Sequence, residues 1–360
     1  QHADTLSQLL GAEGRSNTVG LLVGSLKPAQ KRIAHERIAS NDIKFVIGTH
    51  ALLQDKVDLK NLGLLVVDEQ HRFGVEQRRR LIKQNGFMPH ILSMTATPIP
   101  RSLALTLYGE LDISLLDTMP AGRRPVVTEI VSPNSRTKLN ERIEAELIAG
   151  RQVYVVCPII TDSSFGPMPS AEKIYKQLKE TTFKKWRLGL LHGKMKSVDK
   201  ERIMGQFVSG QLDMLVATTV IEVGISVANA SVMVIEGAER FGLAQIHQLR
   251  GRVGRSDAQG YCFIVPSDSK PPSRRLRALT ESTNGFELAE LDLEIRGPGA
   301  IYGTLQHGEL DLRIAKLSDV KLLAATRQAV GSFMTSGKKL SSYPELARRV
   351  RAAQAVVTLS

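Results

Sequence analysis

Short apolar runs rich in β-branched residues alternate with segments of helical periodicity along most of the chain. Several of these runs are continuously apolar, a pattern typical of strands that are covered on both faces of a parallel sheet. Regular alternation of strands and helices predicts an α/β fold built on parallel sheets. The predicted strands lie at residues 44–48, 62–68, 90–95, 126–131, 152–157, 187–191, 213–218, 231–236 and 261–266.

One helix is predicted in detail, at residues 197–209. Ser197 is the expected N-cap, and Gly210 is the expected stop. Between them, helical spacing puts five apolar side chains on one face, namely Val198, Ile203, Met204, Phe207 and Val208.

The alternation breaks at two places, which predicts where the domains end. Residues 117–125 (DTMPAGRRP) are polar and contain Pro and Gly, as linkers do. After residues 267–273 (SDSKPPS) the β-branched runs stop and helical periodicity takes over, broken by a glycine-rich loop at 296–308. We therefore expect a first α/β domain at 1–117, a linker at 118–127, a second α/β domain at 128–268 and a mostly helical region at 269–360.

Composition and charge narrow the class of protein. Hydrophobic residues make up 42% of the 360 residues and charged residues 23%, which excludes global disorder. No run approaches the roughly 18 apolar residues of a membrane-spanning helix. Lys and Arg exceed Asp and Glu by 12, which favours a polyanionic partner, with nucleic acid the first candidate. The alternative is a basic, soluble protein without such a partner.

The two cysteines, Cys157 and Cys262, are far apart and lie in apolar runs. We expect two buried, reduced thiols in a cytoplasmic protein, and no Cys/His cluster suggests zinc. The chain opens at Gln1 and has no charged-then-apolar leader, so we expect no signal peptide.

The first candidate site is the pair Asp68 and Glu69, directly after the apolar residues 64–67. A buried parallel strand places such residues at its carboxyl end, where α/β folds bind ligands. One carboxylate could hold Mg²⁺ through water, and the other could orient a water that attacks a phosphoryl group. The alternative is an acidic strand end without a metal.

Two further candidate sites follow. Thr95 and Thr97 end another strand and could hydrogen-bond to the carboxylates of the first site; the alternative is a turn fixed by Pro98. Residues 248–255 (QLRGRVGR) hold three arginines separated by glycines, which give charged forks suited to phosphate. The alternative there is a solvated basic turn.

These motifs, in this order, resemble motifs II, III and VI of superfamily 2 helicases, and more narrowly the RecG family of bacterial DNA helicases. The resemblance covers about residues 1–350. Further matching segments are 48–52 (GTHAL), 68–74 (DEQHRFG), 191–195 (LHGKM), 217–224 (ATTVIEVG), 240–254 (RFGLAQIHQLRGRVG) and 292–308 (DLEIRGPGAIYGTLQHG). The last is similar to a translocation motif, which we place within residues 285–310.

The resemblance implies two RecA-like domains, the first truncated at its N-terminus, and a use for ATP and Mg²⁺. It implies that Asp68 holds Mg²⁺ through water and that Glu69 is the catalytic base, with Arg252 and Arg255 as arginine fingers. Other implied catalytic residues are Gln70 and His71. Implied coupling residues are Thr95, Thr97, Gln248, Arg296 and Gln306; implied nucleotide-binding residues are Gly224 and Ser226. Implied DNA contacts are Thr49, His50, His192, Gly193, Thr218 and Thr219.

The chain departs from the family pattern at three points. It contains no G-x-x-x-x-G-K-[ST] loop, which the family uses to cradle the nucleotide phosphates. Ser226 and Ala228 stand where the family usually has Asp and Pro, and Leu305 stands where the translocation motif usually has Arg. We expect a C-terminal piece of a longer protein, lacking the family's wedge domain, that by itself hydrolyses almost no ATP.

The resemblance implies an ATP-dependent helicase or translocase that remodels branched DNA at replication forks and recombination junctions. It also implies a monomer in the bacterial cytoplasm, associated with the nucleoid and not with a membrane. One alternative is a translocase of the transcription-repair coupling type. Another is a module that binds DNA without hydrolysing ATP.

Overall fold

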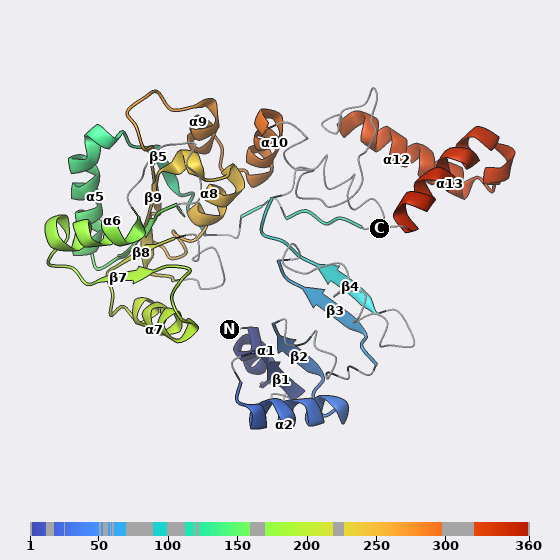
Figure 1. Cartoon of the computed structure of the whole chain (residues 1–360), viewed down its shortest axis with the longest axis horizontal. Coiled ribbons are helices and arrows are strands. Elements are labelled where there is room, and N and C mark those ends of the chain that lie inside the picture. The colour runs from blue at the N-terminus through green and yellow to red at the C-terminus, as the bar shows by residue number, and fades with distance from the viewer. Residues whose placement is uncertain are drawn as a thin grey trace. The chain divides into compact units, whose positions relative to one another are not determined.

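The computed structural model describes residues 2–11, 18–24, 26–49, 52, 57, 59, 61–69, 89–98, 112–116, 118–119, 122–158, 170–218, 227–296 and 320–358. The chain forms two compact units, Gln1–Ala96 and Thr97–Ser360, and each is described by itself. Figure 1 shows the elements of both.

The second unit is built on a six-stranded sheet in which every pairing is parallel. The strand order is β5-β10-β9-β6-β8-β7, so the chain crosses repeatedly from one side of the sheet to the other. The strands are β5 (Val127–Ile130), β6 (Gln152–Val156), β7 (Leu188–Leu191), β8 (Met214–Ala217), β9 (Ala230–Glu236) and β10 (Tyr261–Val265).

Helices cover both faces of this sheet because successive side chains of each strand point to opposite faces. On one face, Val153 and Val155 of β6 pack with α5 (Arg136–Ile148) and α6 (Ala171–Gln177). On the other face, Tyr154 and Val156 pack with α7 (Ser197–Val208), α8 (Leu243–Arg250) and α9 (Arg274–Glu281). The predicted double-sided burial is therefore confirmed for this sheet. Short helical turns complete the unit at η4 (Pro133–Ser135), η6 (Leu178–Thr182) and η8 (Ala238–Arg240).

Within its described residues, the first unit has two two-stranded parallel sheets, β1-β2 and β3-β4. Its elements are α1 (His2–Gly11), β1 (Val19–Leu22), α2 (Pro28–Ala39), β2 (Phe45–Gly48), β3 (Leu64–Val67) and β4 (His90–Ser93). A small core of Leu22, Ile38, Ile43 and Val57 joins α2 to the first sheet. Double-sided burial is not found for β3 and β4, where Leu64, Val66, Ile91 and Leu92 are exposed. No residue of β3 or β4 belongs to the hydrophobic clusters formed by the described residues, so the exposed faces of these strands lack a packed layer there.

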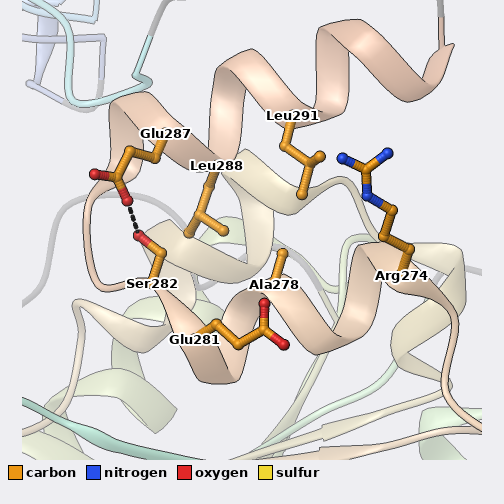
Figure 2. Close-up of a pocket in the computed structure, with 7 residues that line it drawn as sticks. All are labelled: Arg274, Ala278, Glu281, Ser282, Glu287, Leu288 and Leu291. Carbon is orange, nitrogen blue, oxygen red and sulfur yellow. Dashed lines mark hydrogen bonds between the residues drawn. The ribbon is translucent and has the colours of Figure 1, made fainter.

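The remaining helices are α10 (Gly285–Arg296), α12 (Val320–Thr335) and α13 (Pro344–Thr358), with the turn η9 (Leu340–Ser342). The helices α9 and α10 lie side by side and border an open pocket of about 370 Å³ (Figure 2). Its floor is formed by Ala278, Leu288 and Leu291, and across its rim Ser282 donates a hydrogen bond to the Glu287 carboxylate (2.5 Å). Among the described helices, none combines the length and apolar character needed to cross a bilayer.

All nine predicted strands are present, but one strand was missed. The run at β1 (VGLL) is only four residues long and contains Gly20, so its pattern is weak. Gly20 is required by packing, since a Cβ atom there would lie 2.5 Å from the Ile43 side chain.

The helix α7 corrects two details of its prediction. Lys196, and not Ser197, is its N-cap residue, because Ser197 is already the first helical residue. Ile203 and Phe207 face the core as expected, whereas Val198 is 76% exposed and Val208 is also exposed. Gly210 does follow the helix with a left-handed φ of 73°. Cys157 and Cys262 are buried free thiols, as predicted.

Candidate functional site

The acidic pair follows β3, at the carboxyl end of the β3-β4 sheet. The backbone N–H of Glu69 donates to Oδ1 of Asp68 at 2.9 Å, and Glu69 adopts a left-handed φ of 52°. This conformation is uncommon for a residue with a side chain, and it turns the chain sharply as it leaves the strand. Asp68 is exposed and Glu69 is half-buried, so the two neighbouring carboxyl groups lie in different surroundings.

The donor set suits magnesium held mainly by water and phosphate. Among the described residues, no group of three or more His, Cys, Asp or Glu side chains is placed to hold a metal ion. Mg²⁺ at phosphoryl-transfer sites uses one or two carboxylates, with water and substrate oxygens completing its shell. The exposed carboxylate of Asp68 is a hard oxygen donor of that kind, so Asp68 could hold Mg²⁺ through water.

The threonine segment follows β4 directly. Met94 N–H donates to Val67 O at 2.8 Å, so the start of this segment lies beside the end of β3, where the acidic pair begins. Thr97, the first residue of the second unit, accepts a hydrogen bond from Gln248 Nε2 at 2.8 Å. The structure thus brings together two of the predicted coupling residues, Thr97 and Gln248, which are 151 positions apart.

The arginine loop, residues 251–255, begins where α8 ends at Arg250. Val253, the residue between Arg252 and Gly254, is fully buried and anchors the loop in the core of the second unit. Gly254 has a φ of 66°, and a Cβ atom there would lie 3.3 Å from both Gly260 and Val126. A glycine is therefore required for the loop to pack this closely while Arg252 and Arg255 flank it.

Positive charges concentrate on this loop. Arg255 Nε donates to Gly251 O at 2.9 Å, and Nη2 of Arg123 donates to the same oxygen at 3.1 Å. Partial desolvation lowers the pKa of Arg255, and the charges of Arg252 and Arg123 lower it further. The nearby Tyr154 hydroxyl stays protonated: burial raises its pKa to about 12, although Arg252 and Arg255 oppose that rise.

Arg250 does not share this exposed setting, contrary to the expectation that three arginines could approach phosphate. It is only 4% exposed, and its guanidinium donates to Leu279 O, Ser282 O and His247 Nδ1. It therefore joins α8 to the segment that links α9 and α10. A buried arginine whose donors are satisfied by carbonyl groups stabilises this packing instead of contacting a ligand.

The predicted DNA-contacting residues follow strand ends, as expected. Thr49 is exposed after β2, and a Cβ atom on the preceding Gly48 would lie 2.2 Å from Leu22 O, which explains the glycine. His192 follows β7, and its Nε2 lies 3.7 Å from the Glu172 carboxylate.

Gly193 and Thr218 share the carboxyl edge at which β7 and β8 end, because Leu191 pairs with Ala217. Gly193 accepts a hydrogen bond from Lys200 Nζ at 2.7 Å. The Thr218 hydroxyl is buried and has no hydrogen-bond partner in the described part of the chain.

Several predicted site residues lie outside the described residues, namely His50, Gln70, His71, Thr219, Gly224, Ser226 and Gln306. The same holds for the Arg296 side chain, although its backbone ends α10. Sequence reasoning missed Arg123, whose contact with Gly251 spans 128 positions. The only local signal was the pair of arginines in the predicted linker, which is an ordinary feature of a solvated segment.

Three family models match successive parts of the chain. The DEAD/DEAH box helicase model matches residues 1–106, and the helicase conserved C-terminal domain model matches residues 137–257. The model for ATP-dependent DNA helicase RecG, domain 3, C-terminal, matches residues 282–351.

Curated relatives and one solved structure carry the RecG name. The chain is 46% identical over 330 residues to the ATP-dependent DNA helicase RecG of Synechocystis, covering 91% of this chain and 40% of the relative. The chain is 43% identical over 338 residues to RecG of Bacillus subtilis, which covers 93% of this chain and 49% of that relative. A RecG structure bound to a three-way DNA junction matches with a TM-score of 0.66 and 42% identity, over 87% of this chain and 42% of that one. The chain spans about half the length of these relatives, or less.

A more distant structure supports the fold alone. The Mycobacterium smegmatis helicase Lhr matches with a TM-score of 0.54 at 18% identity, covering 74% of this chain and 37% of that chain. The shared feature is an α/β fold of the RecA-like kind, with parallel sheets and helices.

Proposed function

This chain belongs to the RecG family, and we propose that it carries the motor of an ATP-dependent DNA helicase that remodels branched DNA. The substrates would be replication forks and recombination junctions, and the role would lie in DNA repair and recombination in the bacterial cytoplasm, at the nucleoid. The protein would act as a monomer. The observation that carries the proposal is the similarity of the chain, over about nine-tenths of its length, to RecG proteins.

The proposed nucleotide site uses the acidic pair and the arginine loop. Asp68 would hold Mg²⁺ through water, and Mg²⁺ would neutralise charge on the β- and γ-phosphates. Glu69 would accept a proton from the attacking water. Arg252 and Arg255 would stabilise the negative charge that develops on the transferred phosphoryl group, a role that rigid guanidinium forks perform well. Gln70 and His71 would be further catalytic residues, and Gly224 and Ser226 would bind the nucleotide.

Coupling to DNA would run through the threonine segment. The hydrogen bond from Gln248 to Thr97 supports this role because it joins Thr97 to the helix that precedes the arginine loop. Thr49, His50, His192, Gly193, Thr218 and Thr219 would contact DNA phosphates at strand ends. Such contacts carry little base information, so binding would depend on shape and charge.

Replacing the proposed base tests the enzyme proposal. In the full-length protein that contains this chain, Glu69→Gln should lower DNA-stimulated ATP turnover by at least about a hundredfold, because the amide cannot accept the proton. Binding to a synthetic three-way junction should persist. The matched control is Glu201→Gln, which makes the same change on the exposed face of α7 and should leave turnover intact.

The same assay separates the alternatives. Turnover that is unaffected by Glu69→Gln would remove Glu69 from its assigned role. A full-length protein that binds junctions without hydrolysing ATP would be a DNA-binding module. Unwinding of a fork by the unsubstituted protein favours the RecG activity, whereas translocation that displaces a stalled RNA polymerase without unwinding forks favours the transcription-repair coupling alternative.

A further inference from the structure

Residues 123–127 are hydrogen-bonded at three points to the segment between α8 and β10, which contains the arginine loop. Arg123 Nη2 donates to Gly251 O at 3.1 Å. Gln259 Nε2 donates to Pro125 O at 2.7 Å, and Val127 N–H donates to Gly260 O at 2.9 Å. Residues 123–127 and 251–260 therefore form one hydrogen-bonded structure within the second unit, although more than 120 positions separate them.

Arg123 shares a hydrogen-bond acceptor with Arg255. Both guanidinium groups donate to the single carbonyl oxygen of Gly251, the C-cap residue of α8. A carbonyl oxygen has two lone pairs, so the two arginines fill it and fix each other's position. Arg255 has a flexible side chain, and the shared acceptor restricts where its guanidinium can lie.

Within the part of the chain that the structure describes, Arg123 and Arg255 have no acidic partner. The Nε atom of Arg123 is buried and has no hydrogen-bond partner within that part of the chain. Like charges held together without a counterion are unfavourable, and a bound polyanion would relieve this repulsion.

We infer that Arg123 is a positioning residue for Arg255, which it holds through Gly251 in the geometry needed at a nucleotide phosphate. This inference rests on the proposed function, and it deepens the assignment of the arginine loop. Because Arg123 precedes β5 in the segment that we expect to link the two α/β domains, a change in that segment's conformation would move Arg255 directly.

The test measures steady-state ATP hydrolysis with saturating junction DNA, using the full-length protein. Arg123→Ala should lower kcat by about tenfold to a hundredfold, since a displacement of about 1 Å can have that effect. The KM for ATP should change by less than about threefold, because the loss concerns the transition state more than the bound substrate. The matched control is Arg124→Ala: Arg124 is adjacent and exposed, and it should retain the kcat of the unsubstituted protein.

A double substitution separates positioning from an independent or merely structural role. If Arg123 acts through Arg255, adding Arg123→Ala to Arg255→Ala should lower kcat by less than about twofold more. If the fold-losses in kcat of the two single variants multiply in the double variant, the inference is wrong. If Arg123→Ala folds poorly, Arg123→Lys, which keeps the charge and a donor for Gly251, takes its place with a smaller expected loss and the same non-additivity.

The outcomes also separate this inference from the proposed function. A full-length protein without DNA-stimulated hydrolysis would contradict the proposed function itself. If the protein hydrolyses ATP and Arg255→Ala lowers kcat, while Arg123→Ala behaves like Arg124→Ala, only the inference about Arg123 is wrong.

Discussion

Apolar runs of nearly the same character lie in different surroundings in the two units. In the first unit, Val66 of β3 is 48% exposed and Leu92 of β4 is 50% exposed. In the second unit, Val155 of β6 is 1% exposed and Val216 of β8 is fully buried. The runs LLVV and QVYVV both form parallel strands, so local sequence determines the strand but not its burial.

The difference follows from the neighbours of each strand. The strand β6 pairs with β8 on one side and β9 on the other, and helices cover both of its faces. The strand β3 pairs with β4, and these two strands make up the whole of their sheet among the described residues. An isolated two-stranded sheet is marginally stable in water. The second unit can therefore hold the arginine loop rigidly by itself, whereas the acidic pair depends on whatever covers β3.

Hydrogen exchange of the 360-residue chain should show the largest difference between the units. Backbone amides of β9, a fully buried strand paired on both sides, should open only with the whole unit, at a free energy of about 5 kcal/mol or more. Amides of β3 should exchange through local opening, so protection should differ by about four orders of magnitude. Mass spectrometry of exchanged peptides measures both strands in one sample. Equal protection of β3 and β9 would mean that the exposed faces of β3 do not weaken its pairing.

Substitution of a core residue in the second unit should have the next largest effect. Phe207 is fully buried, and its ring lies 4.8 Å from that of Tyr154, centroid to centroid. Phe207→Ala should lower the free energy of unfolding by about 3–5 kcal/mol. The single tryptophan, Trp186, packs against the core of this unit, so urea unfolding followed by its fluorescence reports on this unit alone.

Val66→Ala in the first unit is the contrasting variant. Because Val66 lies in the first unit and Trp186 reports on the second, this substitution should leave the tryptophan transition within about 0.5 kcal/mol of the unsubstituted chain. A shift from Val66→Ala as large as that from Phe207→Ala would mean that the two units unfold together.

The contrast also explains how far sequence reasoning reached. Strand positions were predicted well because β-branched runs bounded by polar segments are a local signal. The strand β1 was missed since its four residues include Gly20. The N-cap of α7 was misplaced by one residue, because Lys196 caps through its backbone and provides no side-chain signal. The exposure of β3 could not be predicted, because burial depends on elements distant in sequence.

The candidate site shows the same limit. The motifs pointed to Asp68, Glu69 and Arg255 because each of these residues lies within a few positions of the end of a strand or helix. Arg250 belongs to the same motif as Arg255, yet tertiary packing buries it against Leu279 and Ser282. Arg123 was missed for the converse reason, since its importance arises only from folding of the segment before β5 against the end of α8.

A pH-dependent effect is expected from a buried histidine of the second unit. Arg250 can only donate, so Nδ1 of His247, which lies 2.8 Å from Arg250 Nη2, must accept and the ring must be neutral. Burial, together with the charge of Arg250, lowers the pKa of His247 to about 4. An unfolded histidine has a pKa of about 6.5, so between these values the unfolded state binds more protons than the folded state. The contribution of the neutral ring is therefore complete above pH 6.5, and it decreases as the pH falls towards 4.

His247→Gln, which keeps an acceptor for Arg250, should flatten this part of the pH profile. The unsubstituted chain should lose at most about 1.4 kcal/mol of unfolding free energy per pH unit to this group between pH 6 and 4.5. Urea unfolding followed by Trp186 fluorescence at several pH values measures the slope. His90→Gln is the matched control in the first unit, where the side chain is exposed on β4, and it should leave the slope unchanged. If His247→Gln leaves the slope as steep as before, protonation of His247 does not set the acid sensitivity of the second unit. The contact between Arg250 and His247 must then tolerate a charged ring.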